Sequence, residues 1–399
     1  MLAITGFAGL TVGGVMGTGG HGSTLVHPTS LSDQATAMTL VDGRGDVVVA
    51  TGDLLKSARI HLGVMGVVVN VTLPVRDKIK LRLETQVLGE EALLNDQGLL
   101  ERLRSADYAF ILWLHGQKKV LAAEGEALPF ETEGDDVAIS PVTAEGLDAQ
   151  LLAHSQRNAA FFCNPAAGPL QNSTITGTFG NITTAGCDTP EACIFGTPWQ
   201  DLAIAVDLAD LPAALRRARQ VMDAMSACMP EWLIRLHGSS DNHMSMAWGA
   251  DKAIIDLVFA IPVAADEPAV FLGATQAVFQ VLMHEFGGVP HWGKNGPAFW
   301  SKDFGPAAER FPRLAEFLTD MTSMDPSGVF QNAFFRRVIG EAEVEKFPGC
   351  ALTAKCICDE DAHCGRDQVC VTPTLPDGKE IGLADVADSR SRIRVCEFS

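Results

Sequence analysis

Basic side chains are scarce in this chain, and their scarcity argues against several kinds of partner. The 399 residues include 30 lysines and arginines but 49 aspartates and glutamates, so the formal net charge is -19. Proteins that bind nucleic acid neutralise phosphates with a basic surface, and an anionic membrane face repels an acidic protein. The composition therefore predicts no nucleic-acid partner and no attraction to an anionic membrane.

Long apolar runs are also missing. No run reaches the roughly 18 to 20 residues that a membrane span needs, because charged or turn residues interrupt each candidate. The first twelve residues, MLAITGFAGLTV, are apolar but lack the basic segment that opens a signal peptide. We therefore predict no transmembrane segment, and we interpret the first residues as a strand from the interior of a domain. The apolar fraction of 47% predicts a globular protein.

Ten cysteines divide into a scattered group and a crowded group. The scattered ones are Cys163, Cys187, Cys193 and Cys228, and the crowded ones are Cys350, Cys356, Cys358, Cys364, Cys370 and Cys396. A zinc site is the alternative to disulfides, but the crowded group lacks paired C-x2-C spacing and has only His363 nearby. We therefore predict a disulfide-rich tail without a metal, in an oxidising compartment.

Three N-x-[ST] sequons are compatible with secretion, and they begin at Asn70, Asn172 and Asn181. Asn70 lies in VVVNVTLPV, which has a strand-like pattern, so we expect glycosylation at the other two. Together with the cysteines, these sequons predict the secretory pathway or the extracellular space.

Local patterns predict several elements and two domain boundaries. Residues 38–51 favour a β-hairpin, and the glycines at 63 and 66 favour a loop leading into a buried strand. A helix is expected over 210–225, with Asp210 as cap, Pro212 in the first turn and apolar residues at helical spacing. A second helix is expected over about 267–286, with a strand at 253–262 between the two. From about residue 76 the sequence changes to charged, helix-prone segments, and KFPGC at 346–350 precedes the cysteine-rich tail. We therefore place domain boundaries near 76 and 346. No internal repeat or low-complexity tract is present.

A literal G-x-G-x-x-G is formed by Gly17, Gly19 and Gly22, and Asp42 follows twenty residues later. In a Rossmann fold this turn would open a helix, but Pro28 cannot lie inside one. Asp42 also lies in the hairpin turn, where Asp-Gly has a conformational reason to occur. The motif is therefore no Rossmann turn. An anion or flavin cradle and a tight turn between strands remain equal alternatives.

The segment HEFGGVPHWGKN, residues 284–295, holds a second cluster of functional side chains. A zincin would need a second histidine at position 288, which is Gly288. His291, Trp292, Lys294 and Asn295 follow the predicted helix. A lysine beside an aromatic ring can face a cofactor or substrate, and a surface loop with a packed tryptophan is the alternative.

Four segments in order resemble one family. They are TVGGVMGTGGHGS at 11–23, SARIHLGVMGVVVNVTL at 57–73, PHWGKN at 290–295 with MDPSGVF at 324–330, and GCALTAKCICDEDAHC at 349–364. Together they resemble the FAD-dependent aldonolactone oxidases of the vanillyl-alcohol-oxidase type, and especially plant-type L-gulono-1,4-lactone oxidases. The tail is the most discriminating segment, because its six-cysteine pattern recurs in the plant branch.

The resemblance implies an α+β fold with three parts. Residues 1–76 would be the C-terminal half of a PCMH-type FAD-binding domain, 77–346 the α+β cap or substrate domain, and 347–399 the disulfide-rich tail. The family normally has well over a hundred residues before the glycine loop. We therefore expect an N-terminally truncated cofactor domain that binds FAD poorly by itself, and a non-catalytic binding module without flavin is the alternative function.

The resemblance also implies roles for individual residues. Those expected along FAD are Gly17, Thr18, Gly19, His21, Gly22, Ser23, Gly63, Gly66 and Val67. Arg235 and Lys294 match the catalytic cation and the lysine that orients sugar hydroxyls, and the expected substrate-binding residues are Asp256, His291 and Asn295. The implied reaction passes hydride from C2 of an aldonolactone to FAD, with O2 or another oxidant as electron acceptor. The product would be ascorbate or an analogue.

One departure from the family concerns the partner of Arg235. Many relatives place a glutamate where this chain has Leu233. The nearest candidate replacements are Glu231 and Asp256, so the sequence leaves the catalytic base open between them.

Overall fold

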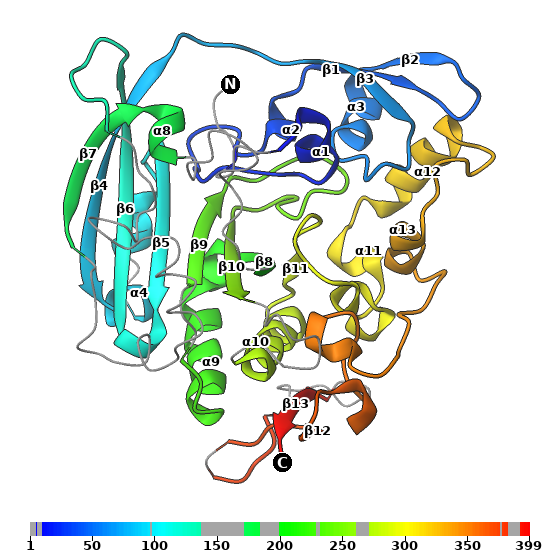
Figure 1. The fold of residues 1–399 in the computed structure, drawn as a ribbon. Helices are drawn as coiled ribbons and strands as arrows, with labels where there is room; N and C mark the ends of the chain where they lie inside the picture. The colour runs from blue at the N-terminus through cyan, green and yellow to red at the C-terminus, as the bar shows by residue number, and fades with distance from the viewer. Residues whose placement is uncertain are drawn as a thin grey trace.

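Two antiparallel sheets organise the protein in the computed structural model (Figure 1). The residues that the structure describes are 5, 10–95, 98–136, 171–183, 199–228, 232–260, 271–375, 377–381 and 392–399. The first sheet has three strands in the order β2-β1-β3, and the second has eight in the order β11-β8-β10-β9-β5-β6-β4-β7. The expected strand over residues 1–12 lies largely outside the described residues, and its last residue begins a helix.

The small sheet confirms the predicted hairpin. Strands β1 (Ala37–Val41) and β2 (Val47–Ala50) pair antiparallel. The Asp42 Oδ1 atom closes the turn by accepting hydrogen bonds from the main-chain N–H groups of Arg44 at 2.8 Å and Asp46 at 2.9 Å. Asp42 therefore has the conformational role that its Asp-Gly context indicates.

Strand β3 (Val67–Thr72) is present, but the prediction that it is buried was wrong. It pairs only with β1 and forms one edge of the small sheet. Its alternating side chains point to opposite faces, and one of these faces is open. As a result Val67 is 54% exposed and Val69 is 57% exposed.

At the centre of the large sheet, one face is apolar and the other carries charged side chains among apolar ones. Trp232, Ile234 and Ile255 point from β9 and β10 into the main core, which they share with helices α9 (Leu211–Ala224) and α10 (Leu272–Glu285). Because side chains alternate along a strand, Arg235 and Asp256 point to the opposite face. The remaining strands are β4 (Ile79–Gly89), β5 (Tyr108–Leu114), β6 (Lys119–Pro129), β7 (Ser173–Thr178), β8 (Trp199–Asp207), β9 (Trp232–His237), β10 (Lys252–Ala260) and β11 (Val289–Pro290).

The predicted helices and the strand between them are confirmed within the described residues. Helix α9 begins with Pro212 in its first turn, as expected, but the Asp210 side chain makes no capping hydrogen bond. Strand β10 covers most of 253–262, and helix α10 ends at Glu285, two residues before Gly287 with its φ of 58°. The expected start of α10 near 267 lies outside the described residues.

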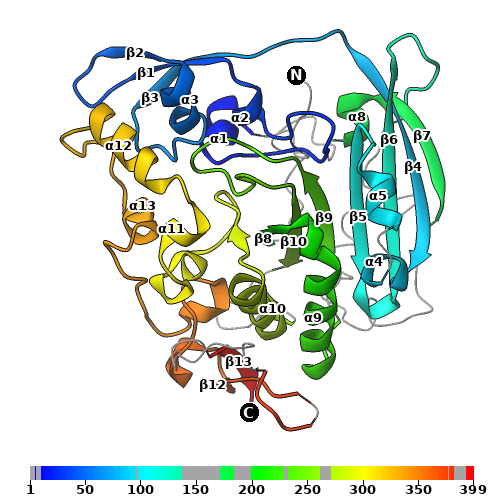
Figure 2. The same cartoon turned by 180° about the vertical axis from the view of Figure 1, so that it is seen from behind.

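Shorter helices surround the two sheets (Figures 1 and 2). Those near the small sheet are α1 (Val12–Gly17), α2 (Leu31–Gln34) and α3 (Gly52–Ala58). The others are α4 (Glu91–Leu94), α5 (Gly98–Leu103), α8 (Phe179–Thr183), α11 (Ala307–Arg310), α12 (Leu314–Met324) and α13 (Ala333–Val338). Within the described part of the chain, no helix is both long and apolar enough to cross a membrane.

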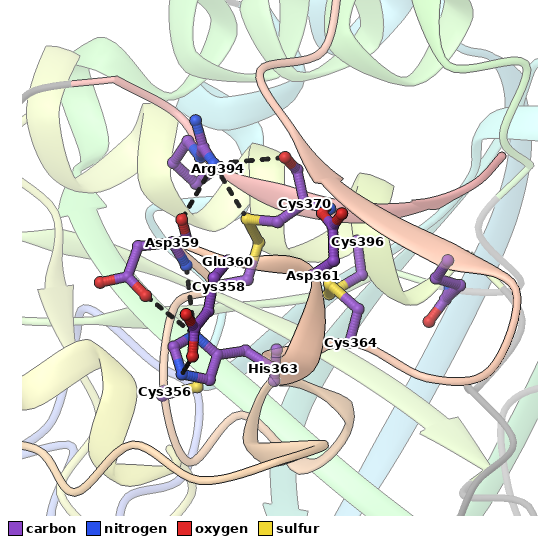
Figure 3. Close-up of a disulfide and its surroundings, with 12 residues drawn as sticks. Cys356, Cys358, Asp359, Glu360, Asp361, His363, Cys364, Cys370, Arg394 and Cys396 are labelled. Atoms are coloured by element: carbon purple, nitrogen blue, oxygen red, sulfur yellow. Dashed lines mark hydrogen bonds and ion pairs between the residues drawn. A yellow bond between two sulfur atoms is a disulfide. The ribbon is translucent and has the colours of Figure 1, made fainter.

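The tail forms the predicted disulfide unit. Its three bonds join Cys350 to Cys356, Cys358 to Cys370 and Cys364 to Cys396. Since these six sulfurs are bonded to one another, they offer no thiolate to zinc. Figure 3 shows Arg394 reaching the carbonyl oxygens of Cys370, at 3.2 Å, and Asp359, at 3.4 Å. The tail ends in strands β12 (Gln368–Val371) and β13 (Val395–Phe398).

The other predicted modification sites are partly visible. Cys228 is disulfide-bonded, whereas Cys163, Cys187 and Cys193 lie outside the described residues. Asn70, Asn172 and Asn181 are all exposed. Strand structure at Asn70 therefore does not hide it, because β3 lies at a sheet edge.

Candidate active site

The glycine-rich stretch begins as a helix and continues as a turn. The Thr11 hydroxyl caps α1 by accepting a hydrogen bond from Gly14 N at 3.2 Å. The helix ends at Gly17, and Gly19 then adopts a φ of 64°, which glycine reaches at little cost. This geometry turns the chain away from α1 toward the large sheet.

A cavity of about 650 Å³ opens beside the end of α1. Of the residues expected along FAD, Gly17, Thr18 and Gly63 line it, and so do Lys294 and Asn295. The other lining residues are Gly13, Gly14, His61, Leu62, Trp292, Gly293, Gly296 and Phe334. This volume is typical of a small-molecule site.

The chemistry of the cavity wall fits a flat neutral group such as a flavin ring. A β-carbon at Gly13 or Gly63 would meet nothing within 4 Å, so a ligand can approach the main chain there. His61 Nδ1 accepts a hydrogen bond from Gly63 N at 3.0 Å, which leaves the proton on Nε2. Nε2 is buried and has no hydrogen-bond partner. Burial lowers the pKa of His61 to about 4, so the ring is neutral at pH 7.

Four other expected cofactor residues, Gly19, His21, Gly22 and Ser23, are not among the residues that line the cavity. Gly19 packs against Ile60, and Gly22 N donates to Thr29 O. The Ser23 hydroxyl donates to Ala109 O and accepts from Leu236 N at 2.9 Å. The Ser23 contacts tie the glycine segment to strands β5 and β9 of the large sheet.

Gly66 and Val67 are not among the cavity-lining residues. Gly66 has a φ of 137°, and a β-carbon there would lie 2.5 Å from Val41 O. Only glycine allows this close approach of the two strands. Val67 follows on the exposed edge strand.

An ion network centred on the buried Arg235 and Asp256 lies on the opposite face of the large sheet from the main core. Arg235 binds Asp256 Oδ2 through Nε at 2.9 Å and through Nη2 at 2.7 Å. Lys294 Nζ lies 2.9 Å from Asp256 Oδ1 and 2.6 Å from Asp201 Oδ2. Asp256 is fully buried, and both of its oxygens face a cation. The network joins strands β8, β9 and β10 to the cavity through Lys294.

The two carboxylates respond to burial differently. Burial alone would raise the pKa of Asp256, but Arg235 and Lys294 hold it below the ordinary value. At Asp201, burial raises the pKa, and Lys294 offsets only part of that effect. Asp201 Oδ1 is also buried without a hydrogen-bond partner. Asp201 is therefore the better proton acceptor of the pair.

The register of the sheet shows which carboxylate lies beside Arg235, where many relatives would have a glutamate at position 233. Asp256 lies directly opposite Leu233 in the antiparallel pair of β9 and β10, and it binds Arg235. Glu231, the other candidate, lies outside the described residues. Asp256 thus supplies Arg235 with a carboxylate from the neighbouring strand.

Three buried histidines adjoin this network. The His21 ring lies 5.4 Å from the ring of His237 and 5.3 Å from that of His291. Burial first, and then nearby cations, lower the pKa of His21 well below its usual value and that of His291 to about 3. The backbone oxygen of His21 also accepts a hydrogen bond from Arg235 Nη1 at 3.4 Å. His21 and His291 are therefore neutral groups around a charged centre.

The loop that carries Lys294 is held by its neighbours. The Asn295 side chain accepts a hydrogen bond from Ala203 N at 3.0 Å and donates to Ala203 O at 2.7 Å and to His291 O at 2.9 Å. Trp292 stacks on Trp300, with ring centroids 4.3 Å apart. The segment thus combines both alternatives from the sequence, because the tryptophan is packed while the lysine lines the cavity.

Two site residues escaped the sequence analysis. His61 lies inside the recognised segment 57–73, and its position between an apolar residue and a glycine-bearing loop was the available signal. Asp201 lies just before the alternating apolar stretch LAIAVDL, where a charged residue in a strand was the signal. Neither signal indicates which distant residue the side chain meets.

Comparisons with known proteins agree with this geometry. The model of the D-arabinono-1,4-lactone oxidase family matches residues 71–338. Probable L-gulonolactone oxidase 6 of Arabidopsis thaliana is 24% identical, and the match covers 89% of this chain and 67% of that protein. The L-gulonolactone oxidase of Mus musculus is 25% identical, over 82% of this chain and 73% of the relative.

A solved structure supports the fold. Cholesterol oxidase from B. sterolicum superposes with a TM-score of 0.64 and 12% sequence identity, over 84% of this chain and 76% of that one. The expected mixed fold and the expected cofactor, FAD, are confirmed. The chain belongs to the D-arabinono-1,4-lactone oxidase family and is an FAD-dependent lactone oxidase.

Proposed function

We propose that the protein oxidises an aldono-1,4-lactone at C2 and yields ascorbate or an analogue. The candidate substrates are L-gulono-, L-galactono- and D-arabinono-1,4-lactone, and the names of the relatives put L-gulono-1,4-lactone first. The observation that carries the proposal is the Arg235–Asp256–Lys294 network beside the glycine-lined cavity. When bound, FAD supplies the hydride acceptor.

Lys294 is the group that we assign to substrate orientation. It lines the cavity, and its ammonium is anchored by Asp201 and Asp256. An ammonium has three donors, so one can point to a lactone oxygen while two remain on carboxylates. A neutral polyhydroxylated lactone suits this site because the lysine's charge is already balanced.

Arg235 is the group that we assign to charge stabilisation. It is buried, and Asp256 fixes its guanidinium on one side. A cation fixed before the reaction stabilises negative charge that develops on a nearby oxygen. Asp201 is the proposed acceptor of the proton released from the C2 hydroxyl, because its Oδ1 is unpartnered and burial raises its pKa.

The test compares Lys294→Met with a matched surface variant, Lys302→Met, whose exposed lysine pairs with the exposed Glu343. Each protein is loaded with FAD and mixed anaerobically with the three lactones, and loss of flavin absorbance is followed. We expect Lys294→Met to slow this reduction about 100-fold, as for removal of one fixed electrostatic group. Lys302→Met should match the parent.

Two results would contradict the proposal. One is flavin-loaded parent protein that none of the three lactones reduces. The other is Lys294→Met that reacts at the parental rate. Failure to take up any flavin would favour the alternative, a binding module without flavin. Oxygen consumption after reduction then tests whether O2 or another oxidant serves as acceptor.

We also infer a secretory or extracellular location. The three tail disulfides fit an oxidising compartment, and the sequon asparagines are exposed. Glycosidase treatment of protein from a eukaryotic host, followed by mass analysis of the peptides around Asn172 and Asn181, tests this inference. Unmodified asparagines in secreted material would argue against glycosylation.

A further inference from the structure

The tail touches the loop that carries Lys294. Ala354 lies in the small loop closed by the Cys350–Cys356 disulfide, and its carbonyl oxygen accepts a hydrogen bond from Ala298 N at 3.1 Å. Ala298 lies four residues after Lys294. A disulfide-closed loop therefore contacts the chain that leads out of the cavity wall.

Gly296 also lies against Ala354. It lines the cavity, and a β-carbon at this position would overlap with the carbonyl oxygen of Ala354. The absence of a side chain lets the two main chains lie against each other. Gly296 is two residues from Lys294, so a shift of Ala354 would move the cavity wall directly.

Several contacts hold Ala354 in this place. Gly349 and Ala354 adopt φ values of 76° and 52°, and Lys355 N donates to Cys350 O at 3.0 Å across the disulfide-closed loop. Gln276 of helix α10 donates from Nε2 to Ala351 O at 2.7 Å. Cys350 and Cys356 are both fully buried. The loop is therefore fixed both by its own disulfide and by the main core.

The lysine loop thus has two anchors. On the side of the sheet, Asn295 holds the Ala203 main chain of β8. On the side of the tail, Gly296 and Ala298 meet Ala354. Lys294 is adjacent to the first anchor, and the second fixes the chain that follows.

We propose that the loop closed by Cys350–Cys356 is a positioning element for Lys294, with Ala354 as the contact that sets the loop 291–296. The tail would then serve lactone oxidation as well as stability. This proposal depends on the proposed function of Lys294.

The first test measures amide hydrogen exchange at residues 291–300. It compares Cys350→Ser/Cys356→Ser with Cys358→Ser/Cys370→Ser, which removes another short tail disulfide. The Ala298 amide is the direct reporter, because it donates to Ala354 O. We expect its exchange to rise about fivefold or more in the first variant, and to stay near the parental rate in the second.

The second test keeps every disulfide. Gly296→Ala should push Ala354 away and lower kcat/KM for the lactone about tenfold at unchanged flavin content. Gly89→Ala, where a β-carbon meets nothing within 4 Å, is the control. Thermal melts of all variants separate an altered loop from general unfolding.

Equal exchange at Ala298 in the two double variants would overturn the proposal, as would parental kcat/KM in Gly296→Ala. If the parent turned over no lactone, the proposed function would fail while the exchange experiment still decided whether the tail positions the loop.

Discussion

His61 and His291 show how burial changes the chemistry of single side chains. Their pKa values fall to about 4 and about 3, below the ordinary 6.5, chiefly because burial disfavours the charged ring. The unfolded chain binds a proton at each ring before the folded chain does. Stability from the neutral rings is therefore complete above about pH 6.5 and is lost as the pH falls toward these folded values.

This linkage predicts a pH-dependent free energy of unfolding. Between pH 6.5 and 5, each neutral ring should lower the free energy of unfolding by about 2 kcal/mol, since one pKa unit corresponds to about 1.4 kcal/mol. Urea titrations of the parent and of His61→Asn check this. The variant should lose about 2 kcal/mol less on acidification, and the two should change alike between pH 7 and 8. If the free energy of unfolding fell equally with pH in the parent and in His61→Asn, His61 would be accessible to protons in the folded protein.

Asp256 predicts a large effect of a single carboxylate. Asp256→Ala leaves the buried Arg235 without its paired carboxylate and leaves Lys294 with Asp201 alone, which should lower the free energy of unfolding by about 3 to 5 kcal/mol. Asp377→Ala is the control, because its pair with Lys379 is exposed to water, so its loss should leave the free energy of unfolding nearly unchanged. Chemical unfolding measures both. A similar small loss in both variants would mean that water reaches the Arg235 network.

At the scale of elements, Gly66 allows a close main-chain contact between β1 and the start of β3. Its backbone conformation and its contact with Val41 O both require glycine. Gly66→Ala should therefore destabilise the flavin-free chain by about 3 kcal/mol. Gly63 also has a positive φ, of 75° against 137° at Gly66, but a β-carbon there has no neighbour within 4 Å, so Gly63→Ala should lower the free energy of unfolding by about 1 to 2 kcal/mol.

Thermal and urea unfolding without flavin check this pair. If both variants lost the same free energy of unfolding, the close contact between Gly66 and Val41 would not explain the effect at Gly66. A loss at Gly66 that appears only with FAD present would instead support the cofactor contact that the family resemblance implies.

At the scale of the whole molecule, the net charge of -19 should destabilise the compact state through self-repulsion. Raising NaCl from 10 to 150 mM is about a fourfold reduction in Debye length. We expect the melting temperature to rise by about 2 to 4 °C, as a change near 1 kcal/mol would produce. KCl should act equally if screening is the cause. A fall in both salts would mean that favourable ion pairs outweigh the repulsion.

The sequence determined the elements whose patterns are local. The alternation around Asp42 gave the hairpin, and Pro212 with the periodic apolar residues gave α9. The crowded cysteines predicted a disulfide-bonded tail, because their spacing suits disulfides better than zinc. Motif order gave the family and the cofactor. The hairpin and the helix depend on neighbours within one strand pair or a few turns, and the six tail cysteines are all within residues 350–396.

Only the tertiary structure decided which of these residues meet. Asp256 reaches Arg235 from the next strand, and Asp201 and Lys294 join them across nearly a hundred positions of the chain. The same is true of Ala354 against Gly296, and of the open face of β3, which local patterning had placed in the core. Register and sheet order set these contacts, and both result from packing the whole core, which no local pattern contains.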